Sequence, residues 1–163
     1  MEDVRETLAG RTARDIMTRD ILTARADWPV SYLAEFLIEH GISGVPVVDE
    51  EDLLVGVASL TDIVRHDSLP AREPDRASAS AFYHHDLESG FSEEDLSSFR
   101  LGNDNDTSVR DIMTPTVFSV TEDATVSMIA KTMVTGRIHR VLVTGENRLV
   151  GIIAAIDVLR LLV

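Results

Sequence analysis

Hydrophobic positions along the chain follow a helical period in some segments and form short continuous runs in others. Residues 30–40 place Leu33 and Leu37 one turn apart on an apolar face, which predicts a helix. Short apolar runs on either side of this helix predict strands. They are residues 21–23, 45–48 and 54–58. A second helix is predicted to begin near Thr61, so the order of elements is β-α-β-β-α.

The second half of the chain has the same order of elements. Its predicted helix carries Val126, Ile129, Ala130 and Met133 on one face, and another helix is predicted to begin near Ile156. Its apolar runs predict three more strands. They are residues 117–120, 141–143 and 149–153.

The two halves are copies of one sequence unit. Residues 14–18 (Arg-Asp-Ile-Met-Thr) recur as residues 110–114, a shift of 110 − 14 = 96 positions. Residues 54–56 (Leu-Val-Gly) recur as 149–151, a shift of 149 − 54 = 95. One residue is therefore missing from the second copy, in a segment that is predicted to be a turn. A length change confined to a turn is what two copies of one folded unit would have.

This repeat predicts an α+β protein made of two β-α-β-β-α repeats that pack about a pseudo-two-fold axis. One repeat alone is too small to bury a substantial core. The predicted parts are an N-terminal extension (1–12), the first repeat (13–66), a long link (67–107) and the second repeat (108–163).

The link is rich in loop-forming residues but is not featureless. Ser92 and Asp95 have the spacing of a helix N-cap and an acidic residue three positions on, which predicts a short helix. Three aromatic side chains are candidates to anchor the link to the rest of the protein. They are Phe82, Tyr83 and Phe91.

Composition excludes several classes of function. The chain has 15 basic and 28 acidic residues, a net charge of −13, so the phosphate backbone of nucleic acids and anionic membranes would repel it. It has no cysteine, which excludes disulfides, thiolate metal sites and cysteine nucleophiles. The charged N-terminal residues do not resemble a secretory signal, and no apolar run approaches the roughly 20 residues that span a bilayer. We expect a cytoplasmic protein.

The repeated segments resemble the cystathionine β-synthase (CBS) domain in its tandem form, the Bateman module. The segments that carry the resemblance occur in the same order in both halves: residues 15–18, 41–49 and 54–62, then 111–115, 137–143 and 149–157. The resemblance implies a non-catalytic regulatory module that binds an adenosine-containing ligand in the cleft between the repeats. It also implies a homodimer and an effector protein that responds to the ligand.

The segment from Gly56 to Asp62 has chemistry that suits such a ligand. It leads from a strand to a helix N-terminus, where backbone N–H groups attract anions and the hydroxyl of Ser59 or Thr61 can bind phosphate. The carboxylate of Asp62 can accept two hydrogen bonds from a ribose diol. The alternative is that Thr61 and Asp62 only cap the helix and need no ligand.

Residues 138–140 (Ile-His-Arg) precede an apolar strand in the second repeat. Arg140 offers a planar donor fork for phosphate, and His139 adds a donor when it is protonated. The resemblance implies that this segment faces the Gly56–Asp62 segment of the other repeat. The residues predicted to bind the ligand are Val57, Ser59, Thr61, Asp62, Ile138, His139 and Arg140.

The corresponding second site has weaker chemistry. Asp157 is retained, but Ala154 and Ile156 stand where the first repeat has hydroxyl groups. Ser43 and Gly44 replace the His-Arg pair, so the phosphate clamp is missing. We expect this site to be weak or empty, or to take a nucleoside without phosphate or S-adenosylmethionine.

No obligatory cofactor, metal or nucleic-acid partner is predicted. AMP is favoured over ADP, ATP and S-adenosylmethionine because a chain of charge −13 penalises more highly charged ligands. The main alternative is an interaction or scaffold module whose clefts bind nothing. A metal or catalytic site at residues 84–86 (His-His-Asp) is disfavoured, since no further ligand stands at a recognisable spacing.

Overall fold

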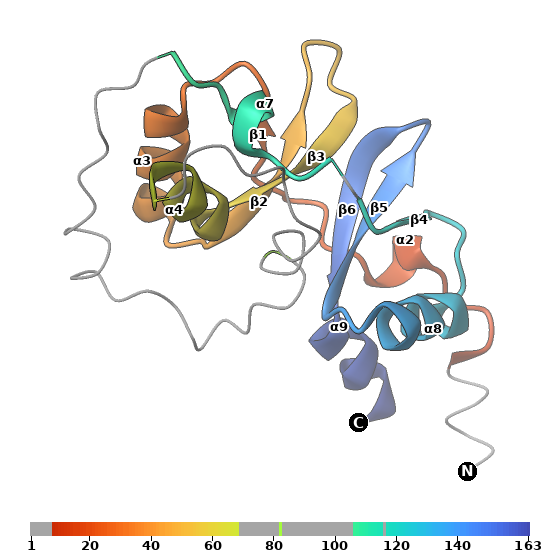
Figure 1. Cartoon of the computed structure of the whole chain (residues 1–163). Coiled ribbons are helices and arrows are strands. Elements are labelled where there is room, and N and C mark those ends of the chain that lie inside the picture. The colour runs from red at the N-terminus through yellow and green to blue at the C-terminus, as the bar shows by residue number, and fades with distance from the viewer. Residues whose placement is uncertain (1–7, 69–81, 83–105, 116) are drawn as a thin grey trace. The chain divides into compact units, whose positions relative to one another are not determined.

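The computed structural model describes residues 8–68, 82, 106–115 and 117–163 (Figure 1). Its two three-stranded sheets and their helices confirm the predicted α+β class and the two repeats. The chain divides into two compact units, one made of residues 22–117 and the other of residues 1–21 and 118–163. Among the described residues, no helix combines the length and the apolar character needed to cross a membrane.

The unit of residues 22–117 is built on a sheet with the strand order β1-β2-β3. Its elements are β1 (Ala24–Arg25), α3 (Val30–His40), β2 (Gly44–Val48), β3 (Leu54–Ser59), α4 (Leu60–Ser68) and α7 (Val109–Ile112). β2 pairs with β1 in parallel and with β3 in antiparallel orientation. Leu33 and Leu37 of α3 are fully buried with Val45 and Val47 of β2, so the predicted apolar face of the helix covers the sheet.

The other unit has the same topology, with the strand order β4-β5-β6. Its elements are α2 (Ala13–Ile16), β4 (Ser119–Thr121), α8 (Val126–Gly136), β5 (Arg140–Gly145), β6 (Arg148–Ala154), α9 (Ala155–Leu159) and the 3-10 turn η1 (Arg160–Leu162). Glu146 and Asn147 join β5 to β6 with φ angles of 52° and 63°, as in a two-residue hairpin turn. β2 and β3 are joined by the longer segment 49–53, so the length difference between the repeats lies in the predicted turn.

The first strand lies later in the chain than predicted. We expected residues 21–23, but the residues that pair with β2 are Ala24 and Arg25. Ala24 is completely buried, whereas Leu22 is 42% exposed. The apolar run therefore includes a surface residue, and the small alanine next to it occupies the interior.

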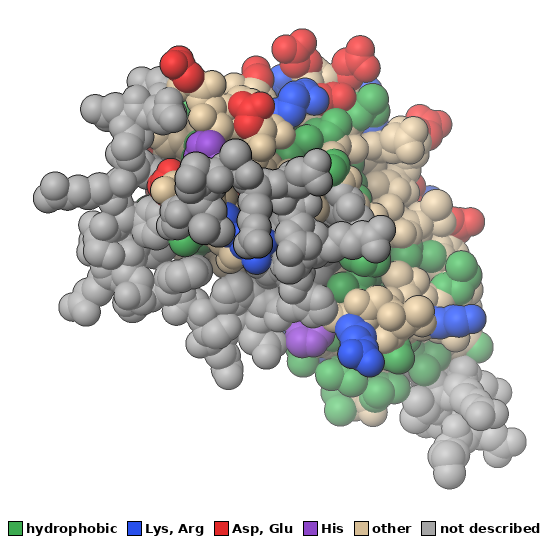
Figure 2. Space-filling model, in the orientation of Figure 1, with side chains coloured by type: hydrophobic (Ala, Val, Ile, Leu, Met, Phe, Trp, Pro, Cys, Tyr) green, Lys and Arg blue, Asp and Glu red, His purple; other side chains and the backbone are tan. Residues whose placement is uncertain are grey.

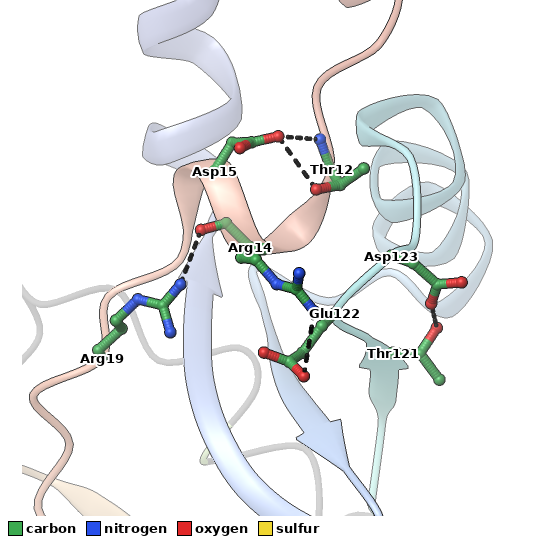
Figure 3. Close-up of polar contacts among 7 residues, drawn as sticks. All are labelled: Thr12, Arg14, Asp15, Arg19, Thr121, Glu122 and Asp123. Atoms are coloured by element: carbon green, nitrogen blue, oxygen red, sulfur yellow. Dashed lines mark hydrogen bonds and ion pairs between the residues drawn. The ribbon is translucent and has the colours of Figure 1, made fainter.

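A short segment of each repeat is built into the unit of the other repeat. In one unit, the backbone N–H groups of Ala13 and Arg14 in α2 donate to the carbonyl oxygens of Ala124 and Glu122 at 2.8 and 3.0 Å. An ion pair between Arg14 and Glu122 at 3.5 Å adds to this contact (Figure 3).

In the unit of residues 22–117, α7 makes the equivalent contacts. The N–H groups of Val109 and Arg110 donate to the carbonyl oxygens of Trp28 and Ala26 at 2.8 and 2.9 Å. The compact units therefore cut across the two sequence repeats.

Glycines permit the close approach of these segments to the strands. Val57 and Thr114 exchange two backbone hydrogen bonds, and Thr18 and Ile152 do the same. A Cβ at Gly56 would lie 2.6 Å from the carbonyl oxygen of Thr114. A Cβ at Gly151 would overlap the side chain of Met17. Both glycines of the repeated Leu-Val-Gly sequence therefore leave room for the crossing segment, Gly56 for its backbone and Gly151 for a side chain.

We expect Gly56→Ala to lower the free energy of unfolding by about 1–3 kcal/mol, because the added methyl group overlaps a backbone atom that cannot move easily. Urea unfolding measures the change. Gly136→Ala is the control, since a Cβ there has its nearest neighbour at 3.4 Å. The control should be neutral or slightly stabilising. An equal loss in both variants would contradict the steric argument.

Candidate functional site

The turn from β3 into α4 holds three of the polar residues that were predicted to bind a ligand. Ser59 is the last residue of β3, and Thr61 and Asp62 lie in the first turn of α4. Ser59 and Asp62 are 3% and 5% exposed, and Thr61 is half-buried. A buried carboxylate at a helix N-terminus needs hydrogen-bond donors, and the backbone of this turn supplies them.

One carboxylate oxygen of Asp62 is used to begin the helix. Its Oδ2 accepts hydrogen bonds from the Ser59 backbone N–H at 2.8 Å and from the Ser59 hydroxyl at 3.0 Å. The Asp62 N–H in turn donates to the Ser59 hydroxyl at 3.4 Å. This is a capping box. Asp62 therefore caps the helix, as the alternative interpretation predicts, but its capping partner is Ser59 rather than Thr61.

The other carboxylate oxygen of Asp62 has no such role. Among the residues that the structure describes, no donor forms a hydrogen bond with Oδ1, and no fully buried side-chain oxygen lacks a partner. Oδ1 therefore keeps access to solvent. The Thr61 hydroxyl has no hydrogen-bond partner within the described residues either. The turn from β3 into α4 thus offers a ligand one carboxylate oxygen and one hydroxyl group.

Burial raises the pKa of Asp62 from 3.8 to about 6. The hydrogen bonds from Ser59 and the positive charge of Arg65 oppose this shift, but the loss of solvation is larger. Shifted carboxyl groups of this kind are typical of functional sites.

The turn from β6 into α9 presents fewer polar groups to a ligand. Asp157 Oδ2 accepts a hydrogen bond from the Ala154 N–H at 2.9 Å, which repeats the backbone part of the cap. Its Oδ1 is engaged by the Arg160 guanidinium at 3.4 Å. Ala154 and Ile156 carry no hydroxyl group. The polar groups at the two turns therefore differ, and the weaker second site stays a prediction.

His139 and Arg140 lie next to the β6–α9 turn of their own unit. Arg140 begins β5 and pairs with Ala154, and the carbonyl oxygen of His139 accepts a hydrogen bond from the Ala155 N–H at 2.8 Å. The His139 side chain is exposed, whereas Arg140 is partly buried. That burial lowers the pKa of Arg140. An arginine held partly out of water is suited to binding an anion, because its charge is less screened there.

Ser43 and Gly44 occupy the same position beside the β3–α4 turn. Gly44 pairs with Ser59, and the Ser43 carbonyl accepts a hydrogen bond from the Leu60 N–H at 2.9 Å. Phe82 of the link is 3% exposed here, and a Cβ at Gly44 would lie 3.0 Å from its ring. Phe82 therefore anchors the link as predicted. Tyr83, Phe91, the helix predicted at residues 92–99 and the segment 84–86 lie outside the described residues.

Two of the predicted ligand residues are buried and hydrogen-bonded within their own units, and their contact with a ligand stays a prediction. Val57 and Ile138 are 1% and 3% exposed. Both backbone polar groups of Val57 are paired with Thr114, and the Ile138 N–H donates to Met133 at 2.9 Å. The described parts of the chain contain no group of three or more His, Cys, Asp or Glu residues that could hold a metal ion.

The remaining predicted residues divide between the two compact units. Ser59, Thr61 and Asp62 belong to the unit of residues 22–117, and His139 and Arg140 belong to the other unit. Their meeting in one site stays a prediction.

Comparison with known sequences identifies the repeats. The family model of the CBS domain matches residues 13–68 and again residues 109–163. The chain is 28% identical over 160 residues to an inosine-5′-monophosphate dehydrogenase of Methanocaldococcus jannaschii. That alignment covers 98% of this chain but only 25% of the dehydrogenase, so the chain spans a quarter of that relative's length.

Solved structures of CBS domains have the same fold. The CBS domain of a membrane protein from Sphaerobacter thermophilus matches with a TM-score of 0.67 and 25% identity, over 99% of this chain and 94% of the other. The CBS domain pair of protein MJ0100, solved with 5′-methylthioadenosine and S-adenosyl-L-methionine, matches with a TM-score of 0.58 and 25% identity. That match covers 93% of this chain and 95% of the other.

The raised pKa of Asp62 predicts how stability depends on pH. Between the unfolded value of 3.8 and the folded value of about 6, the folded protein binds the proton more tightly. The free energy of unfolding should therefore fall as pH rises through this window, and the contribution of Asp62 should be constant above it. Urea unfolding of the wild type and of Asp62→Asn, measured from pH 4 to pH 7, isolates the effect as a difference between the two proteins.

The control for this experiment is Asp111→Asn. Asp111 accepts the same two capping hydrogen bonds, from the Ser108 N–H at 2.9 Å and hydroxyl at 3.0 Å, but its side chain is exposed. A difference between wild type and Asp62→Asn that stays flat through this pH window would contradict the effect of burial.

Proposed function

Because the chain belongs to the CBS-domain family and carries two CBS domains in tandem, we propose that it is a non-catalytic regulatory module that binds an adenosine-containing ligand. The observation that carries this proposal is the carboxylate of Asp62. It is buried and fixed by Ser59 through one oxygen, while the other oxygen remains available to hydrogen-bond donors. A ribose offers two adjacent hydroxyl donors to such an oxygen.

The proposed site has a ribose end and a phosphate end. Asp62 binds the ribose, and Ser59 and Thr61 lie beside it at the start of α4. Arg140 and His139 supply the cations for the phosphate, as the resemblance implies. Burial makes the guanidinium of Arg140 a stronger partner for an anion than an exposed arginine would be. Val57 and Ile138 pack behind the polar groups.

AMP is the ligand that we favour. One phosphate is enough to engage the Arg140 end, and each additional phosphate would meet the repulsion of a chain with a net charge of −13. The site at Asp157 is proposed to be weaker, because Arg160 already occupies the carboxylate oxygen that a ribose would need. A nucleoside or S-adenosylmethionine is the better candidate there.

Such a module signals through a change in the relative populations of the arrangements that its two repeats adopt. A ligand that touches both repeats favours whichever arrangement it binds more tightly, and only that difference in affinity can be transmitted. We propose that the protein acts as a homodimer and that a separate effector protein responds to the change.

A scaffold function is the second candidate, and one observation favours it. The hydrogen bonds of Asp62 also occur at Asp15, whose Oδ2 accepts from the Thr12 N–H at 2.7 Å and from its hydroxyl at 3.0 Å. Capping alone therefore accounts for an aspartate in this position.

Ligand binding by wild type and Asp62→Asn distinguishes the two candidates. Thermal unfolding is followed with adenosine, AMP, ADP, ATP and S-adenosylmethionine, since a ligand that binds the folded state must raise its stability. We expect saturable stabilisation by AMP. Asp62→Asn should weaken it by at least about tenfold, because charge-assisted hydrogen bonds contribute about 1.5–3 kcal/mol each. Asp111→Asn loses an equivalent cap and should bind normally. No stabilisation by any ligand would favour the scaffold.

Arg140→Ala tests the phosphate end. The variant should bind AMP at least about tenfold more weakly and adenosine with nearly unchanged affinity, because only AMP carries a phosphate. Isothermal titration calorimetry measures both affinities. Arg148→Ala removes an exposed arginine of the same unit and should change neither. Equal losses for AMP and adenosine in Arg140→Ala would contradict the assignment of the two ends.

A further inference from the structure

Asp62 carries the only buried carboxyl group among the described residues. On the face of the molecule that Figure 2 shows, acidic side chains lie at the surface. The two oxygens of Asp62 have different surroundings. Oδ2 accepts hydrogen bonds from the backbone N–H and the hydroxyl of Ser59, whereas Oδ1 accepts none from the described residues. The carboxyl group therefore has one engaged oxygen and one that stays open to a ligand.

A proton on this carboxyl group would bind to Oδ1. Oδ2 already accepts two hydrogen bonds, which use both of its lone pairs, while the lone pairs of Oδ1 are available. Once protonated, Oδ1 becomes a hydrogen-bond donor. Two ribose hydroxyl groups that donate to the ionised oxygen would then lose their acceptor. The proton and the ribose therefore compete for the same atom.

We propose that the ligand binds while Asp62 is ionised and leaves as the carboxyl group takes up a proton, so that acidification empties the site. This inference rests on the proposed function and adds that pH regulates the same site. Asp157 does not repeat the arrangement, because its Oδ1 lies 3.4 Å from the guanidinium of Arg160. The dependence on pH is therefore assigned to the first repeat.

The surroundings of Asp62 bring this competition close to neutral pH. Burial raises its pKa to about 6, while the hydrogen bonds from Ser59 and the charge of Arg65 act in the opposite direction. About half of the carboxyl groups are then ionised at pH 6, and about a tenth at pH 5. An aspartate with the ordinary value of 3.8 would stay ionised over most of this range.

Arg65 is the charged side chain that acts on Asp62 within the described part of the chain. α4 packs against β3, α3 and α7, and β3 carries no titratable side chain. The remaining titratable or charged side chains of these helices do not contribute to the pKa of Asp62. They are Tyr32, Glu35, Glu39 and His40 of α3, Arg110 and Asp111 of α7, and His66 and Asp67 of α4.

Adenosine binding at different pH values tests the proposal. Adenosine has no phosphate, so neither the titration of a phosphate group nor the proposed phosphate end of the site enters the result. Isothermal titration calorimetry measures the dissociation constant of the wild type from pH 5 to pH 8. Affinity follows the ionised fraction, so the dissociation constant should be nearly constant above pH 7 and about tenfold higher at pH 5.

The same titrations count the proton. They are repeated at pH 6 in buffers that differ in their enthalpy of ionisation. About half a proton should be released for each adenosine bound, because about half of the free sites are protonated at that pH and the occupied sites are not. At pH 8 no proton should be released.

Three variants identify the group that titrates. Any adenosine binding that remains in Asp62→Asn should not vary with pH, since an amide does not titrate. Arg65→Gln should keep the wild-type affinity at pH 8 and move the midpoint of the pH dependence upward, because a charge that favours the ionised carboxyl group is lost. His66→Gln is the control. It removes an exposed titratable side chain of the same helix and should change neither the affinity nor the proton release.

The outcomes separate this inference from the proposed function. Adenosine binding that is equally tight at pH 5 and pH 8, or that releases no proton at pH 6, overturns the dependence on ionisation and leaves the proposed function standing. A midpoint that Arg65→Gln does not raise overturns the assignment to Asp62. No adenosine binding at pH 8 overturns the ribose end of the proposed site together with this inference, while AMP binding is decided separately. Thermal unfolding without ligand checks that each protein is folded over the pH range.

Discussion

A pair of backbone hydrogen bonds between Val57 and Thr114 holds one compact unit together, and the equivalent pair joins Thr18 to Ile152 in the other. Each pair ties a segment of one repeat to a strand of the other repeat. The absence of a Cβ leaves room for the carbonyl oxygen of Thr114 at Gly56 and for the side chain of Met17 at Gly151. In the first unit, the crossing at Val57 lies two residues before Ser59, the last residue of β3, and so fixes the backbone next to the turn into α4.

The carboxylate of Asp62 shows how the fold and the proposed ligand depend on one group. Its Oδ2 holds the first turn of α4, and burial raises its pKa to about 6. Burying this carboxylate costs stability, because its charged form loses part of its solvation. Donors from a ribose would satisfy Oδ1 and favour the ionised form, so ligand binding and deprotonation would support each other. Functional sites are the places where such a cost in stability is expected.

Much of this fold could be predicted from hydrophobic spacing, because α3 and α8 each bury one apolar face and leave the other in water. α2 and α7 escaped prediction, since four residues are too few to display a helical period. Their signal was the spacing of Thr12 and Asp15, which Ser108 and Asp111 repeat. The capping partner of Asp62 was also missed, because Ser59 follows the predicted strand and was considered only as a phosphate ligand. The proposed meeting of residues from the two units rests on the family resemblance, because local sequence patterns carry no information about tertiary packing.

The two repeats share the residues that their common backbone contacts require, and they differ in polar side chains that the fold does not require. The glycines at the crossings and the capping aspartates occur in both repeats, because both repeats have the same crossing and the same helix cap. Thr61 corresponds to Ile156, and Gly44 corresponds to Arg140 at a shift of 140 − 44 = 96. At these positions one unit has a polar group that the other lacks, although the backbone is alike. Duplication alone would give two equal sites, so the unequal side chains support the proposal that one site is the stronger.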